Sequence, residues 1–291
     1  MTTNSRSRME LIVSMMIFGS IGAIRRFSDL PSSVMLWMRA AISIVVILLI
    51  LRIAHKKLDL KAIQRNWKIL VCSGLLLCIN WVFIFEAYKN TAVSVASLCY
   101  YTQPAFVILI TAIFYKEKHS SRSIVCVVIA LLGMIPVSGI FQSSSTTIGF
   151  LGVVEALIAA ILYAMDIIVS RDIKDVSPYD ATLVRMAVSC VVLFVYSLFT
   201  EDYRALTFNT RSILVTIILG VVYSGLVYVL YYSAIRYVKS AEIAAISYID
   251  PLESVLLSVF LLHEPISVFT VVGAIMILGS TLFNELAEIK S

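Results

Sequence analysis

The chain has 291 residues, of which 60% are hydrophobic and only 14% charged, with a net charge of +5 and a mean hydropathy of +0.96. A soluble domain carries charge on about a quarter of its residues, because it must present a polar surface to water. The composition therefore excludes a soluble globular protein, and the lack of a long basic run with interleaved aromatics argues against a nucleic-acid partner.

Ten apolar segments follow one another along the chain, most of them near the length of about 20 residues that crosses a bilayer as a helix. The connections between them are mostly short and polar, which leaves no room for a soluble domain. Because a helix satisfies its own backbone hydrogen bonds in lipid, we expect an all-α integral membrane protein. The predicted spans are residues 10–27, 34–53, 68–88, 92–115, 123–140, 148–170, 180–200, 212–235, 241–263 and 266–286.

Lys and Arg gather in every second connection, for example in residues 52–68 and 116–122, whereas the connections on the opposite side carry few of them. Cytoplasmic loops of membrane proteins are enriched in these residues. The pattern predicts a multi-pass protein of the cell membrane with both termini in the cytoplasm.

A short motif occurs in both the fourth and the ninth segment, at a constant separation of 147 residues. The recurring pairs are Tyr101 and Tyr248, Pro104 and Pro251, and Glu117 and Glu264. We therefore expect two copies of a five-helix unit, residues 1–143 and 144–291. Because five is odd, the second copy must enter the membrane from the opposite side, which gives the inverted repeat found in many secondary transporters.

Several motifs are typical of one family of carriers. They are Gly19-Ser20 late in the first segment, Arg39 early in the second, Ala87-Tyr88-Lys89 at the end of the third, and the prolines and glutamates of the fourth and ninth. With these residues the whole chain resembles the EamA-like transporters of the drug/metabolite transporter superfamily. The resemblance implies a ten-helix inverted-repeat carrier that works without ATP on substrates from amino acids and amines to nucleobases and drugs. Asp166 departs from the uncharged stretch that is usual there.

Two carboxylates, Asp250 and Glu253, fall in the middle of the ninth segment and share one helix face. Ionisable groups at that depth are costly, so they mark candidate sites. Pro251 and its repeat mate Pro104, which follows Gln103, are predicted to kink their helices and free backbone carbonyls. No basic residue is expected at the same depth. The carboxylates would then bind a substrate ammonium, another cation or a proton; the alternative is that they are protonated and serve only packing.

Aromatic and amide side chains are expected to surround this site, because ring faces attract an ammonium group and hydroxyl or amide groups bind polar atoms. The alternative for each aromatic is a place in the interfacial belt or in packing. The candidate substrate-binding residues, besides Gln103, Asp250 and Glu253, are Asn80, Trp81, Tyr101, Tyr163, Tyr228 and Tyr248.

Two pairs of opposite charge lie at matching depths in neighbouring segments. Arg39 and Glu86 lie near the outer ends of the second and third segments, and Asp166 and Arg185 near the inner ends of the sixth and seventh. Each pair could be a structural ion pair or a gate that opens during transport.

Signatures of enzymes and cofactors are missing from the sequence. The three histidines lack metal-ligand spacing, the cysteines lie in apolar runs without CxxC, and there is no Walker A motif. We therefore expect no enzyme activity, cofactor or metal. The expected partners are a small-molecule substrate, the lipid bilayer and a coupling ion such as a proton. One chain holds both halves, so a monomer suffices, although a dimer stays open.

The leading hypothesis is a secondary carrier that exports small amino-containing metabolites, in particular amino acids, by alternating access. The midplane carboxylates and the tyrosines around them favour it. An importer of choline-like or polyamine cations would use the same groups. A membrane scaffold or enzyme subunit is the alternative from another class.

Overall fold

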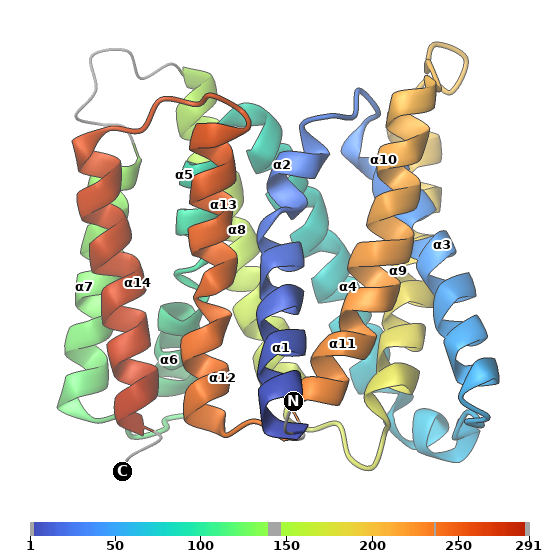
Figure 1. The fold of residues 1–291 in the computed structure, drawn as a ribbon, viewed down its shortest axis with the longest axis horizontal. Coiled ribbons are helices and arrows are strands. Elements are labelled where there is room, and N and C mark those ends of the chain that lie inside the picture. Colours follow the sequence, from blue (N-terminus) through green and yellow to red (C-terminus); the bar gives the residue numbers. More distant parts are fainter. Residues whose placement is uncertain (1–2, 139–146, 236, 289–291) are drawn as a thin grey trace.

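The computed structural model describes residues 3–138, 147–235 and 237–288. These residues form fifteen helical segments and, within the described part, no strand. The segments combine into ten rods that run side by side through the bundle (Figure 1). Here a rod means one crossing of the bundle, built from one helix or from consecutive helices. The predicted all-α fold with ten spans is thereby confirmed.

Five rods make up the first half, and the first and fourth of them are interrupted. Their helices are α1 (Thr3–Gly19) with α2 (Ile21–Arg25), α3 (Ser32–Ile53), α4 (Leu60–Asn90), α5 (Val93–Tyr100) with α6 (Gln103–Phe114), and α7 (Ser121–Val137).

The second half repeats the arrangement, and here the eighth and ninth rods are interrupted. Its helices are α8 (Thr147–Ser170), α9 (Pro178–Thr200), α10 (Thr210–Val221) continued by the π-helical turn η1 (Val222–Leu226) and α11 (Val227–Ala234), α12 (Ser240–Ser247) with α13 (Ile249–Phe260), and α14 (Val268–Glu288). The expected boundary between residues 143 and 144 lies outside the described residues.

Seven of the helical stretches are long and apolar enough to span a membrane, and 121–137 and 210–226 are shorter apolar helices. The third rod is longer than predicted, because α4 begins at Leu60 rather than near residue 68. The side chain of Asp59 accepts a hydrogen bond from the backbone N–H of Ala62 and caps the helix. The basic residues at the start of α4 therefore mark the end of the apolar span and not the end of the helix.

The internal repeat is visible in the turns that end the fourth and ninth rods. The backbone N–H of Glu117 donates to the carbonyl of Thr111 at 3.1 Å, and that of Glu264 donates to the carbonyl of Ser258 at 3.0 Å. The residues just before the two glutamates, Lys116 and His263, both have positive φ, at 54° and 53°. The same turn has thus been built twice, once at each end of the bundle.

The two halves interlock. The most extensive helix contacts join α4 to α8 and α9, α3 to α9, and α7 to α14, and each of these pairs crosses from one half to the other. α7 and α14 form one edge of the bundle, while α1, α5, α8 and α13 lie nearer its middle (Figure 1). α1 begins and α14 ends at the same end of the bundle, as an even number of spans requires (Figure 1).

Candidate functional site

The fourth and ninth rods are broken halfway along their length. Tyr101 and Thr102 separate α5 from α6, and Tyr248 separates α12 from α13. Pro104 and Pro251 lie in the first turn of the second helix in each case, where a missing backbone N–H leaves no hydrogen bond unmade. The predicted kinks are therefore complete breaks. Such discontinuous helices line the substrate sites of many secondary transporters.

Asp250 connects the two broken rods. It lies in the first turn of α13, and its carboxylate forms a hydrogen bond with the side chain of Tyr101. Although it is deep in the protein, part of its surface is accessible to water. Asp250 takes part in none of the salt bridges among the described residues. A carboxylate in this position can accept hydrogen bonds from a cationic ligand.

Arg39 of α3 extends into the bundle and is only 3% exposed. Its Nε donates to the hydroxyl of Ser224 at 2.9 Å. The guanidinium carbon lies 4.7 Å from the centre of the Trp81 ring. Trp81 stays a predicted substrate-binding residue, and in this structure its ring face carries the guanidinium of Arg39. The predicted ion pair of Arg39 with Glu86 is not formed, since Glu86 binds Lys89 at 3.0 Å, three residues further along α4.

Tyr88 packs against the first rod in this region, because a Cβ added at Gly22 would meet its ring. Its ring is almost fully buried, and its hydroxyl bonds to Ser97. Arg39 is thus a basic side chain inside the bundle, near the breaks in the rods. The position of a helix along the membrane follows from the sequence, whereas the inward reach of a long arginine side chain does not.

Two further interruptions meet at this place. Ser20 lies between α1 and α2, and its hydroxyl is 2.5 Å from the hydroxyl of Tyr223 in η1. The next residue of η1, Ser224, holds Arg39. A Cβ added at Gly19 would collide with the backbone carbonyl oxygen of Asp250, so the first rod packs directly on the ninth. Single-turn π-helices are frequent at functional sites. All four interrupted rods thus converge around Arg39 and Asp250.

An aromatic wall borders the site. The ring of Tyr100 lies 5.7 Å from that of Tyr163 and 6.3 Å from that of Tyr101. Asn80 is fully buried, with its amide donating to the carbonyl of Ala159 at 2.6 Å and its oxygen 3.4 Å from the hydroxyl of Tyr100. Asn80 therefore supports the wall by tying α4 to α8.

Other predicted residues take different positions. Tyr248 bonds to Thr281 of α14, whereas its repeat mate Tyr101 bonds to Asp250. Glu253 has its Cβ against Gly19 of α1. The side-chain oxygen of Gln103 is buried without a hydrogen-bond partner among the described residues. Tyr228 belongs to α11, but its side chain lies outside the described residues.

Asp166 and Arg185 come together through a third residue. The carboxylate of Asp166 accepts hydrogen bonds from the hydroxyls of Ser73 and Ser170. Arg185 donates to the same Ser170 hydroxyl at 2.7 Å. The expected direct ion pair is thus a bridged one, buried between α4, α8 and α9.

Two repeat-related ion pairs tie the ends of the bundle. At the end where α2 and α13 finish, Arg26 binds Glu264 at 2.8 Å, and the backbone N–H of Val93 donates to the same carboxylate at 2.8 Å. At the other end, Arg171 binds Glu117 at 3.3 Å, with both side chains more than 40% exposed. Apart from the recurrence of the glutamates, no sequence pattern predicted these partners.

Comparisons with known proteins agree with this architecture. The sequence pattern of the EamA-like transporter family matches the chain twice, at residues 9–139 and 150–285. The uncharacterized transporter YxxF of Bacillus subtilis (strain 168) is 27% identical over 275 residues, which cover 94% of this chain and 87% of that protein. An uncharacterized transporter of Archaeoglobus fulgidus is 25% identical over 213 residues, 72% of this chain and 71% of its own.

A protein of known crystal structure shares the fold with a TM-score of 0.66 at 16% sequence identity, covering 98% of this chain and 99% of its own. The family matches together span most of the chain, and the family and the named relatives are transporters. The chain belongs to the EamA-like transporter family, and it is a multi-pass membrane transporter of small molecules.

Proposed function

We propose that the protein is a secondary carrier that exports small amino-containing metabolites, with amino acids as the main substrate class. One observation carries the proposal: a carboxylate, Asp250, bonded to Tyr101, and a guanidinium, Arg39, held by Ser224, both lie where four interrupted rods meet. An amino acid has one cationic and one anionic end, and both would find a partner here.

The chemistry of the two ends supports this substrate class. A carboxylate accepts charge-assisted hydrogen bonds from an ammonium group, and a guanidinium binds a carboxylate through two parallel hydrogen bonds. The rings of Tyr100 and Tyr101 beside Asp250 can contact the substrate side chain or the face of a cation. We assign Asp250 to the ammonium group and Arg39 to the carboxylate.

Transport by alternating access requires the site to open to each side in turn. The tie between Arg26 and Glu264 and the tie between Arg171 and Glu117 lie at opposite ends of the bundle. In the proposed cycle each tie opens when the site faces its end. The hinges are the breaks between α5 and α6 and between α12 and α13.

An importer of choline-like or polyamine cations is the second candidate. Asp250 and the aromatic wall favour it, because these groups suit a cation that lacks a carboxylate. In that case the substrate would have no anionic group for Arg39 to bind. The two candidates therefore differ in whether the substrate needs an anionic end.

A thermal-shift experiment on the detergent-purified protein separates them. A ligand at one hundred times its Kd stabilises the folded state by about 2.7 kcal/mol, which raises the melting temperature measurably. We expect amino acids to raise it more than the amines that remain after decarboxylation, and N-acetylated amino acids to have no effect. An equal or larger shift with choline or a polyamine would favour the second candidate and contradict ours.

A further inference from the structure

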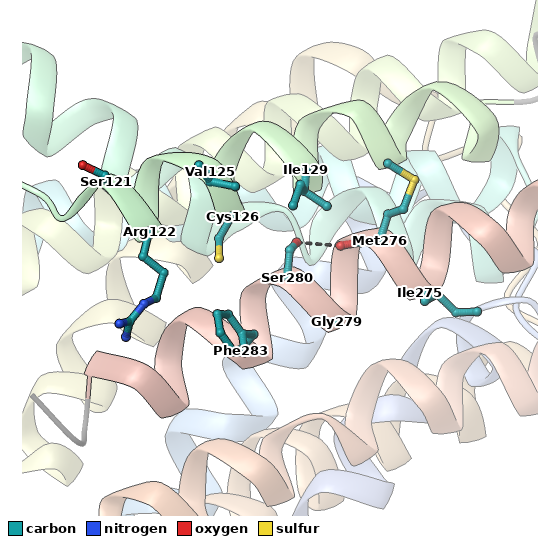
Figure 2. Close-up of a pocket in the computed structure, with 10 residues that line it drawn as sticks. All are labelled: Ser121, Arg122, Val125, Cys126, Ile129, Ile275, Met276, Gly279, Ser280 and Phe283. Atoms are coloured by element: carbon teal, nitrogen blue, oxygen red, sulfur yellow. Dashed lines mark hydrogen bonds between the residues drawn. The ribbon is translucent and has the colours of Figure 1, made fainter.

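A groove runs between α7 and α14 on the outer edge of the bundle, away from the candidate site. Its volume is about 590 Å³, and Figure 2 shows the side chains that line it. Gly279 forms part of its floor, where an added Cβ would meet no atom within 4 Å. The walls are apolar, with Val125 on α7 and Ile275 and Phe283 on α14.

The groove faces the bilayer. The exposed fractions of the side chains are 56% for Val125, 69% for Ile275 and 59% for Phe283. In a membrane protein, apolar side chains that are exposed to this degree face lipid. A hollow of this kind in the hydrocarbon region is too apolar for water. The acyl chain of a lipid therefore matches the polarity of this groove.

One charged side chain lies at the end of the groove. Arg122, in the first turn of α7, is exposed and extends beside Phe283 (Figure 2). It forms no hydrogen bond or ion pair with any residue that the structure describes. Arg8 and Arg171, at the same end of the bundle, each bind a glutamate. A guanidinium at the membrane surface is a ligand for phosphate.

We propose that this groove binds an anionic phospholipid, with one acyl chain along Gly279 and the phosphate against Arg122. Apolar walls and a terminal cation match the two parts of such a lipid, and anionic lipids are attracted to basic residues at the membrane surface. A second copy of the chain is the competing occupant. Charge argues against it, because a parallel two-fold dimer would bring another Arg122 to the same side of the membrane.

Native mass spectrometry of the full chain in detergent tests the proposal. Phosphatidylglycerol and phosphatidylcholine with identical acyl chains serve as the anionic and zwitterionic probes. The wild type should bind phosphatidylglycerol about fivefold more tightly, the effect of one basic residue at an anionic surface. Arg122→Gln should remove this preference. Gly279→Leu should weaken the binding of both lipids, since the side chain fills the groove without a clash.

Arg52→Gln is the matched control, because Arg52 is an exposed arginine at the end of α3 on the same side of the bundle but outside the groove. It should keep the preference, and melting temperatures should verify that all variants are folded. The proposal is overturned if Arg122→Gln binds both lipids as the wild type does. It is also overturned if the wild type is a dimer that Gly279→Leu dissociates, because the groove would then hold a second copy.

Discussion

Asp250→Asn should strongly reduce amino acid transport in proteoliposomes at substrate concentrations below the KM while leaving the protein folded. The substitution preserves size and leaves an oxygen to accept the hydrogen bond of Tyr101. It removes the charge that would pair with the ammonium group. A hydrogen bond to a charged group contributes about 1.5–3 kcal/mol, so amino acid affinity should fall about 10- to 100-fold.

Glu155→Gln is the control for this prediction. Glu155 is another carboxylate within a membrane span, but it binds Asn90 at the end of α4 and not a residue at a break in a rod. Its variant should transport at the rate of the wild type. Unchanged transport by Asp250→Asn would show that the Asp250 carboxylate serves packing. Retained amino acid binding with lost uphill transport would assign Asp250 to a coupling proton.

Arg39→Gln should change which ligands bind. We expect amino acid affinity to fall by about 10- to 100-fold, because the substrate carboxylate loses a charge-assisted bidentate partner. Affinity for the decarboxylated amine should change little, since that ligand has no group for Arg39. Calorimetric titration of both ligands measures the ratio of the two affinities, which does not depend on how much of the variant is folded.

The alternative outcome for Arg39→Gln is an equal loss for amine and amino acid. That result would mean that Arg39 only supports the site through Trp81 and Ser224. Trp81→Phe separates these roles further. It retains an aromatic ring beneath the guanidinium, so it should leave the ratio of the two affinities at the wild-type value.

The spans and the breaks could be predicted from the sequence because they depend on composition along the chain. The lengths of the apolar segments predicted the ten rods, and Pro104 and Pro251 predicted where two rods are interrupted. Repeat spacing also predicted that Pro104 and Pro251 lie at matching depths. These properties concern position along the membrane normal, which hydropathy reports directly.

Rotation of a helix about its own axis is not encoded in hydropathy, and the missed features depend on it. Tyr248 occupies the repeat position of Tyr101 but faces α14. Arg39 extends into the bundle, where η1 presents Ser224 to it. The π-helical turn has no local signature. The binding of Glu86 by Lys89, in contrast, was visible as a spacing of three residues on one helix.

Exchange in proteoliposomes tests the central claim most directly. Vesicles containing the purified wild type are loaded with an unlabelled amino acid and diluted into the same labelled amino acid. The proposed carrier should accumulate label transiently, because a site that alternates between the two sides exchanges one substrate molecule for another. Vesicles loaded with choline should accumulate none. Accumulation driven by choline but by no amino acid would contradict the account.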